Sequence, residues 1–266
     1  MNFHESISPG RFSLLTRLSH CADYNSNRSS GLRSNMQARK NGDLGRGGLR
    51  AKGYTSHTEL TKMTLKACLI ARDAVSNMRE LFTTPSRIAF LAIRDCEKEL
   101  DQIERYIDEH LPDAITQVSE LEARKLLACL KFITDLERIG DLVLGVAQRL
   151  QSRRSLPQRD TDGLAQMAAV LYEMLERIHA GFASLDLESA TRVLRADAEV
   201  DRICHALFRK HLADSSARRS PLSFEVLLMA QALERAGDHA KNLAEELLGL
   251  IEGHTARHPP KRTPTL

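Results

Sequence analysis

The 266-residue chain has no tryptophan, and aromatic residues make up only 5% of it. Few aromatics together with many Ala, Leu and Glu residues favour helical bundles over β-sheets. The five cysteines are odd in number, scattered and never arranged as Cys-x-x-Cys, which predicts buried thiols in a reducing compartment. No apolar run approaches the ~20 residues of a transmembrane helix. We therefore expect a cytoplasmic protein without membrane insertion.

Proline is scarce between residues 56 and 252. It occurs there only at positions 85, 112, 157 and 221, each where the apolar periodicity lapses. No strand-like alternation of useful length is present. We predict an all-α fold, with Ser86, Asp186 and Ser220 as candidate N-caps. The helices are expected at 58–82, 86–110, 119–152, 160–183, 187–212 and 221–252.

Basic charge is concentrated at the two ends of the chain. Residues 1–55 hold nine Lys and Arg against three Asp and Glu, and seven of the fourteen glycines. This composition, without sustained apolar periodicity, predicts a disordered basic extension; a transit peptide or an upstream translation start are the other interpretations. Residues 253–266 form a basic tail. The body has 26 Lys and Arg against 32 Asp and Glu, and this acidic balance argues against a nucleic-acid partner.

A short motif occurs twice in the body. Leu-Glu-Arg-Ile-Gly-Asp at 136–141 recurs as Leu-Glu-Arg-Ala-Gly-Asp at 233–238, 97 residues later. Such self-similarity at a fixed offset indicates repeated structural units. With six expected helices, it predicts two pseudo-symmetric three-helix bundles in tandem, at 56–152 and 160–252.

Acidic pairs with i, i+4 spacing lie on the second, third, fifth and sixth expected helices. Both members of such a pair lie on one helix face, and each pair here lies on or beside an apolar stripe. The pairs recur at offsets of 97 and 100 residues. A buried unpaired carboxylate costs several kcal/mol or more, so these acids need a cation. The candidate metal ligands are Glu97, Asp101, Glu137, Asp141, Asp197, Asp201, Glu234 and Asp238.

Each expected bundle would gather four carboxylates, whose mutual repulsion must be neutralised. Oxygen-rich clusters bind cations such as Fe, Mn, Mg or Ca, with Zn as a further candidate. Two other interpretations stay open: a polar network with Arg side chains such as Arg138 and Arg235, and simple solvation. His205 and His239 stand near the acids and are candidate additional ligands.

No catalytic residues are indicated. A ferritin-like di-iron enzyme needs Glu-x-x-His on two helices, whereas the body offers only Glu176-x-x-His179. No Ser/His/Asp or Cys/His arrangement and no Gly-rich loop after a strand is present. A non-enzymatic interaction protein is favoured, and a metal-dependent or metal-storing enzyme of the carboxylate-bundle type is the alternative.

The motif at 136–141, its extended copy Glu-Arg-Ala-Gly-Asp-His-Ala-Lys-Asn-Leu-Ala-Glu at 234–245, and the other two acidic pairs resemble the PhoU family of phosphate-transport regulators. The resemblance covers residues 56–252. The first copy departs after Asp141, where Gly145 stands opposite Asn242, so an Asn contribution is expected only in the second copy.

The resemblance implies that the acidic pairs hold multinuclear iron or zinc clusters on the bundle surface, with Mn or Mg as alternatives. It implies a cytoplasmic negative regulator of phosphate uptake and of phosphate-starvation signalling. The implied partners are the ATPase of the phosphate ABC transporter, the sensor histidine kinase of the phosphate response, and a second copy of the chain in a homodimer. A detached relative of the regulatory domain of sodium–phosphate cotransporters is a further alternative.

Overall fold

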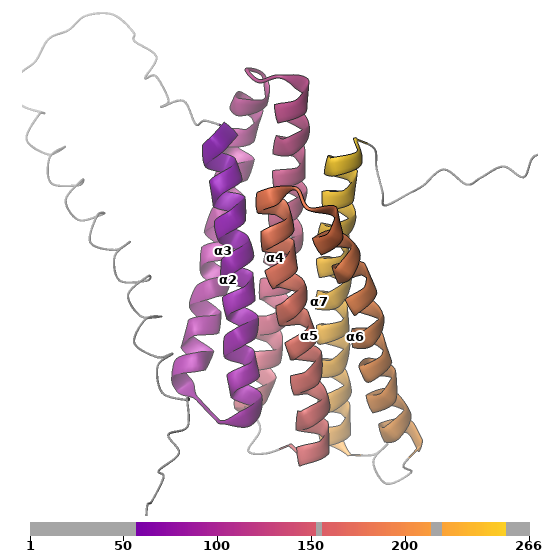
Figure 1. Cartoon of the computed structure of the whole chain (residues 1–266). Helices are drawn as coiled ribbons and strands as arrows, with labels where there is room; N and C mark the ends of the chain where they lie inside the picture. The colour runs from indigo at the N-terminus through magenta and orange to yellow at the C-terminus, as the bar shows by residue number, and fades with distance from the viewer. Residues whose placement is uncertain (1–56, 153–155, 214–219, 254–266) are drawn as a thin grey trace, which may run out of the picture. The chain divides into compact units, whose positions relative to one another are not determined.

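A computed structural model describes residues 57–152, 156–213 and 220–253. These residues form helices and no strand, which confirms the all-α prediction (Figure 1). The predicted extension at 1–55 and, apart from Gly253, the basic tail lie outside the described residues. The helices are α2 (His57–Thr83), α3 (Arg87–Ile115), α4 (Glu120–Ser152), α5 (Gln158–Ser184), α6 (Leu187–Ala213) and α7 (Pro221–Glu252).

The predicted N-caps are formed. The Ser86 side chain accepts a hydrogen bond from a backbone N–H of the first turn of α3 at 3.1 Å. Ser220 does the same for α7 at 3.3 Å, and Pro221 occupies the first helical position, where its missing N–H costs nothing. The Asp186 carboxylate accepts from the backbone N–H of Glu188 at 3.1 Å and so caps α6.

Helix α3 continues five residues past its predicted end. Pro112 was expected to stop it, but the helix runs through this residue to Ile115. A proline in the last turns removes only one backbone hydrogen bond, and Leu111 and Ala114 beside it are buried at 8% and 1% exposure. Packing of these two side chains therefore outweighs the local penalty of the proline.

The helices form two equivalent three-helix units. In the first, α2, α3 and α4 contact one another, and in the second α5, α6 and α7 do the same. The units join through contacts of α2 with α5 and of α4 with α7 (Figure 1). Helices α4 and α7 thus hold matching positions, which confirms the predicted pseudo-symmetric tandem repeat. Helices α3 and α6 contact only helices of their own unit and are the outer helices.

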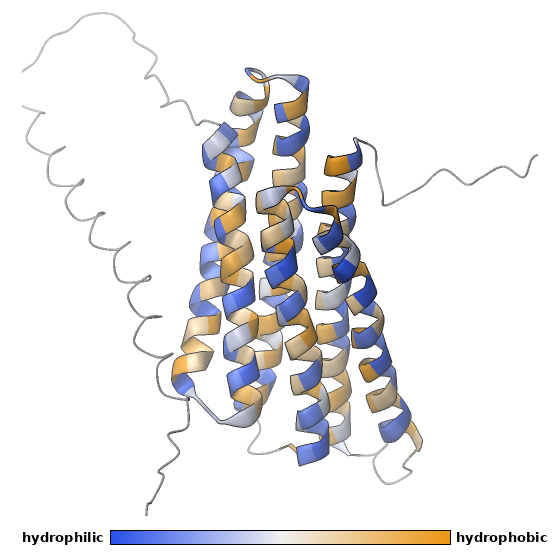
Figure 2. Cartoon of the chain, in the orientation of Figure 1, coloured by the Kyte–Doolittle hydropathy of each residue, from blue (hydrophilic) through white to orange (hydrophobic). Residues whose placement is uncertain are grey.

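One hydrophobic core runs through both units. Figure 2 shows hydrophobic residues interspersed with hydrophilic ones along every helix, as expected for helices with one buried face. Phe132 of α4 and Phe182 of α5 meet across the unit boundary with ring centroids 4.4 Å apart, and both are at most 1% exposed. An aromatic pair of this kind contributes about 0.5–1.5 kcal/mol beyond its buried area.

Ion pairs reinforce the junction at its edges. Arg72 of α2 pairs with Glu176 of α5 at 2.6 Å, and Lys131 of α4 pairs with Glu246 of α7 at 2.9 Å. Glu176, the acid of the Glu-x-x-His sequence, is thereby engaged in a structural contact. None of the described helices combines the length and hydropathy of a membrane span.

Candidate metal centres

A glycine in each motif lets the outer helix approach the motif helix. A Cβ atom on Gly140 of α4 would lie 2.7 Å from Cδ1 of Leu100 in α3, and one on Gly237 of α7 would lie 3.3 Å from Val200 in α6. A Cβ contact below 3.0 Å forces the neighbouring atom to move, here the end of the Leu100 side chain, so alanine would be accommodated less easily at position 140 than at position 237. Close approach brings the acids of the two helices next to one another.

The first carboxylate set lies between α3 and α4. It comprises the four predicted acids of this unit and one acid that the sequence analysis missed, Glu104. Oxygens of Asp101, Glu104 and Glu137 lie within 4.8 Å of one another, a spacing that suits a shared cation. Glu104 follows Asp101 by three residues and therefore lies on the same helix face. This i, i+3 spacing could have identified Glu104 from the sequence, but only i, i+4 pairs were considered. The set is Glu97, Asp101, Glu104, Glu137 and Asp141.

Glu137 is the most constrained acid of this set. Its side chain is only 12% exposed, and its Oε2 atom is buried without a hydrogen-bond partner. The nearest cation is Nε of Arg138, 3.5 Å from that oxygen. Burial, and then the negative charge of Asp141, raises the pKa of Glu137 from 4.5 to about 7. A divalent cation here would supply the partner that Oε2 lacks.

The pKa values of the neighbouring Glu97 and Glu104 are also raised. Burial and the charges of Asp101 and Asp141 raise the pKa of Glu97. Burial and the charge of Asp108 raise the pKa of Glu104. Burial and neighbouring carboxylates therefore disfavour the ionised forms of Glu97, Glu104 and Glu137, as expected of a cluster without a cation.

Apart from Asp197, which is buried, the predicted acids lie less deep than their place beside apolar stripes predicted. Glu137 and Glu234 are half-buried, but Asp141 and Asp238, one turn further along, are exposed. A step of four residues turns the side chain by about 40° and carries it from the stripe to the rim. Both sets therefore reach the surface of the helices.

Two arginines contact the first set from outside. Arg138 lies 3.4 Å from Asp141, and Arg105 lies 3.1 Å from Asp101. Both arginines are more than half exposed, at 57% and 63%. Pairs of this type contribute about 0–1 kcal/mol, so they leave most of the repulsion in place. The Arg network foreseen as an alternative is present only in this weak form, and Arg235 of the second copy is exposed.

The second carboxylate set lies between α6 and α7 and consists of Asp197, Asp201, Glu234 and Asp238. Burial and then the charge of Asp238 raise the pKa of Glu234. Burial and then the charge of Asp197 raise the pKa of Asp238. The four acids predicted for this unit therefore influence one another, but among the described residues they form no trio as tight as that of the first set.

A lysine enters the second set. Nζ of Lys241 lies 2.7 Å from Oδ2 of Asp197, whose side chain is only 6% exposed. This hydrogen bond, followed by burial acting the opposite way, raises the pKa of Lys241. Lys241 follows Asp238 by three residues and lies on the same face. The sequence analysis missed its role, although the lysine stands within the quoted motif.

The position of Glu104 is taken by Cys204 in the second unit, at the same offset of 100 residues that relates Asp101 to Asp201. Cys204 is 6% exposed. Burial and then the charges of Glu234 and Asp201 raise its thiol pKa to about 11. The second set therefore has four carboxylates and a protonated thiol where the first has five carboxylates.

His239 and Asn242 were expected to contribute to the second set, but their side chains contact another residue. Nδ1 of His239 lies 2.9 Å from Oδ1 of Asp135 in α4, and Nδ2 of Asn242 lies 3.4 Å from the same oxygen. Both side chains thus serve the contact between α4 and α7. The buried carboxylate of Asp135 attracts them because it needs hydrogen-bond donors. His205 stays on the exposed side of the second set, where it partly offsets the rise in the pKa of Glu234 that burial and the neighbouring carboxylates cause.

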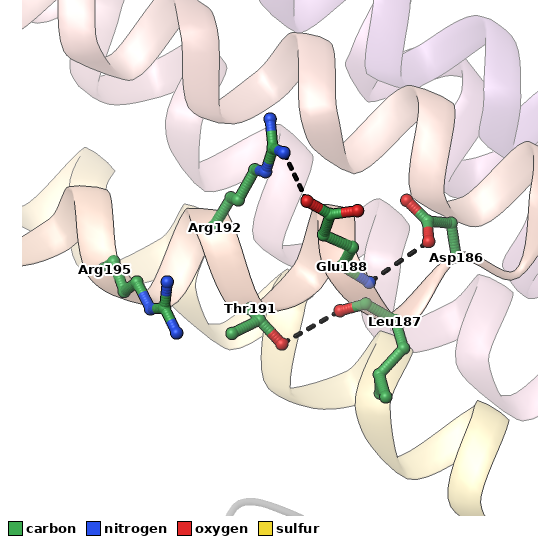
Figure 3. A pocket seen from close by; sticks show the side chains of 6 residues that line it. All are labelled: Asp186, Leu187, Glu188, Thr191, Arg192 and Arg195. Carbon is green, nitrogen blue, oxygen red and sulfur yellow. Dashed lines mark hydrogen bonds and ion pairs between the residues drawn. The ribbon is translucent and has the colours of Figure 1, made fainter.

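Surface depressions lie away from both sets. One, of about 480 Å³, is lined at the start of α6 by residues that include Asp186, Glu188, Arg192 and Arg195. Figure 3 shows that Asp186 caps the helix and that Arg192 pairs with Glu188. Asp186, Glu188 and Arg192 are thus engaged in contacts at the start of α6, so the depression does not present a prepared binding site.

Comparison with known proteins agrees with this architecture. The PhoU domain matches residues 64–150 and again residues 164–247. The chain belongs to the PhoU family. The two matches fall on the two three-helix units, one on each.

Relatives in bacteria are named for an accessory role. A phosphate-specific transport system accessory protein PhoU homolog of Burkholderia sp. is 32% identical over 61% of this chain and 72% of its own length. The homolog of the same name in Xylella fastidiosa strain 9a5c is 27% identical, over 73% of this chain and 92% of its own. These names describe no reaction, in agreement with the prediction of a non-enzymatic protein.

Two crystal structures have the same fold. PhoU from Pseudomonas aeruginosa superposes with a TM-score of 0.67 at 24% identity, covering 74% of this chain and 97% of that one. The phosphate transport system regulatory protein PhoU from Streptococcus pneumoniae gives 0.68 at 20% identity, over 75% and 96%. At these identities the likeness supports the fold alone.

Proposed function

We propose that this protein is a negative regulator of phosphate uptake and of phosphate-starvation signalling, acting through protein contacts. The observation that carries this proposal is the double match to the PhoU domain, together with relatives named as accessory proteins of phosphate-specific transport. The protein acts in the cytoplasm as a homodimer. Its partners are the ATPase of the phosphate ABC transporter and the sensor histidine kinase of the phosphate response.

Metal binding is the second part of the proposal. The first set would hold a cation through Asp101, Glu104 and Glu137, with Glu97 and Asp141 at the rim, and the second set through its four acids. The unpartnered Oε2 of Glu137 and the 4.8 Å oxygen spacing support the first set. An all-oxygen donor set suits iron, Mn or Mg, and zinc is also accommodated. The cation would neutralise the acids between the outer and motif helices and fix the separation of these helices.

The regulatory role is tested by deleting the gene and recording a phosphate-starvation reporter at high phosphate. Loss of a negative regulator should switch the reporter on although phosphate is plentiful, and the intact gene should restore silence. A reporter that stays silent in the deletion strain would overturn the regulatory proposal.

The metal proposal is tested on purified protein by metal content and melting temperature, each with and without chelator. Glu137→Gln and Asp238→Asn should each lower metal uptake, because each removes a charged ligand from one set. Glu120→Gln, an exposed acid on α4 that pairs with Arg124, is the matched control and should leave uptake unchanged. Full metal content in both ligand variants would exclude the assigned role.

A metal-storing enzyme of the carboxylate-bundle type is the competing function. Among the described residues, neither set includes the paired Glu-x-x-His ligands of such enzymes. Glu176, the acid of the Glu-x-x-His sequence, pairs with Arg72 instead. Iron loading followed by oxygen consumption separates the two functions. Sustained turnover of oxygen by the loaded protein would favour the enzyme.

A further inference from the structure

The two carboxylate sets differ in one built-in charge. In the second set the ammonium of Lys241 lies 2.7 Å from Asp197, a carboxylate with a side chain only 6% exposed. The repeat offset of 97 residues places Leu144 at the matching position of the first set. Leu144 packs against the hydrophobic core and offers no charge. The repeat therefore supplies a cation to one set and an apolar side chain to the other.

The cations around the first set are not equivalent to this lysine. Arg105 and Arg138 contact Asp101 and Asp141, whose side chains are 40% and 45% exposed, at 3.1 and 3.4 Å. Arg138 also lies 3.5 Å from the buried Oε2 of Glu137, but it makes no hydrogen bond to that oxygen. Water replaces such contacts at little cost. The carboxylate of Asp197 is buried, and withdrawing Lys241 would leave it without this donor, which is costly. An incoming cation would therefore displace the arginines readily but Lys241 only with difficulty.

The second set also has less negative charge. Cys204 stands where the first set has Glu104, so the second set has four carboxylates against five before Lys241 is considered. Lys241 then neutralises one of these four. The demand for an added cation is correspondingly lower, because fewer unneutralised like charges face one another.

We propose that Lys241 is a resident cation of the second carboxylate set, so that the two sets take up a divalent cation with unequal affinity, the first before the second. This inference rests on the metal-binding part of the proposed function. The protein would then bind metal in two steps, and at low metal supply only the first set, between α3 and α4, would be filled. Filling the second set, between α6 and α7, would require the ammonium to leave Asp197.

The test is a Mn²⁺ titration of the full-length protein, with bound metal counted and the melting temperature recorded at each step. Lys241→Leu gives the second set the residue of the first, and Lys241→Gln keeps a hydrogen-bond donor while removing the charge. Leu144→Lys makes the reverse change in α4. Each variant is also made in a Glu137→Gln background, where the first set is weakened and the second dominates the titration.

The matched control is Lys131→Leu. Lys131 also pairs across helices with a half-buried acid, at 2.9 Å, but its partner Glu246 belongs to neither set. Its removal should therefore lower stability without changing Mn²⁺ uptake. This control separates loss of an ion pair from loss of a resident cation.

We expect the parent to bind Mn²⁺ in two unequal steps. Both Lys241 variants should tighten the weaker step by about tenfold to a hundredfold, since a hydrogen bond to a charged group no longer has to be broken. Leu144→Lys should weaken the tighter step. Lys241→Leu should also melt lower than the parent without metal and gain more from Mn²⁺. Should Lys241→Leu prove too unstable to titrate, Lys241→Gln alone decides the outcome.

Two equal steps in the parent, or Lys241 variants that bind Mn²⁺ no better than the parent, would overturn the inference. The latter result would leave the metal proposal intact if the parent still binds Mn²⁺ at the first set. A parent that binds no Mn²⁺ would overturn both the order of filling and metal binding by the natural protein, even if the Lys241 variants gained a site. Absence of binding in parent and variants alike would refute both.

Discussion

The imidazole of His239 in α7 donates from Nδ1 to Oδ1 of Asp135 in α4, 2.9 Å away, and joins the two three-helix units by a part-buried polar contact. Asp135 is 8% exposed, and Asn242 of α7 approaches the same oxygen at 3.4 Å. The repeat-related positions are Ala232 and Leu142, both apolar and packed against the core. The pseudo-symmetry of the helices is therefore broken chemically at this contact.

This asymmetry predicts a non-additive double substitution. His239→Leu leaves the carboxylate of Asp135 without its main donor in α7 and should destabilise the protein by about 1–3 kcal/mol. Asp135→Ala with His239→Leu installs the repeat-related apolar pair and should recover most of that loss. Urea unfolding of both single variants and the double variant measures the coupling. Additive losses would show that the two side chains act independently.

The glycines of the two motifs should respond differently to alanine. Gly140→Ala places a methyl group 2.7 Å from Cδ1 of Leu100, which is fully buried, so the end of this side chain has to shift within the packed core. Overpacking of this type costs about 1–3 kcal/mol. In Gly237→Ala the contact with Val200 is 3.3 Å, and the gain in helix propensity of about 1 kcal/mol offsets it.

We therefore expect Gly140→Ala to unfold at lower urea concentration than the parent, and Gly237→Ala to stay close to it. Gly145→Ala, also in α4, is the control, because an added Cβ meets nothing within 4 Å there. A loss in Gly145→Ala as large as in Gly140→Ala would attribute the effect to helix α4 in general.

Glu137 predicts how the metal-free protein responds to pH. Its folded pKa of about 7 lies above the ordinary 4.5, so the folded state holds this proton more tightly than the unfolded chain does. The penalty for ionising it is absent below pH 4.5, grows between pH 4.5 and 7, and is complete above pH 7. The metal-free parent should therefore lose stability from pH 5 to pH 8.

Glu137→Gln lacks this ionisation and should show a shallower loss over the same range. Glu97 and Glu104 have pKa values raised in the same direction, so part of the parent's slope should remain. The measurement is the melting temperature of chelator-treated protein at closely spaced pH values. Parallel curves for parent and variant would contradict the assigned environment of Glu137.

The sequence predicted the helices and the paired acids because both follow from short-range spacing. Apolar periodicity located the six helices, and only Pro112 misled, since burial of Leu111 and Ala114 is a tertiary effect. The repeat offset placed α4 and α7 in equivalent positions. These features depend on the order of residues along a single helix.

Contacts between helices were less accessible to prediction. Lys241 and Glu104 lie within or beside the acidic motifs in the sequence, but what they contact depends on how α6 packs against α7 and α3 against α4. His239 was expected at the carboxylates beside Asp238, yet it bonds to Asp135, a residue 104 positions away that has no repeat-related acid. A periodic pattern specifies which face a residue occupies, and partners on another helix determine what it binds.

The charge of Glu104 should affect the stability of the folded protein in opposite directions with and without metal. In the metal-free protein Glu104 raises the pKa of Glu137 and so contributes to the repulsion in the first set. Glu104→Gln should therefore raise the melting temperature of chelator-treated protein at pH 8. With Mn²⁺ present the same change removes one of the three closely spaced oxygens and should reduce the stabilisation by metal, which is about 2.7 kcal/mol at a hundredfold excess over the dissociation constant.

The control is Glu109→Gln, an exposed acid further along α3 that should change neither measurement. Thermal melts of the parent and both variants, at pH 8 with chelator and then with excess Mn²⁺, give the four comparisons needed. A structural role for Glu104 would lower both melting temperatures together, and a solvated role would change neither. If Glu104 is a ligand in a repelling cluster, Glu104→Gln raises the melting temperature without metal and reduces the rise in melting temperature that Mn²⁺ produces. The reason is that the same carboxylate repels its neighbours without metal and coordinates the cation when metal is present.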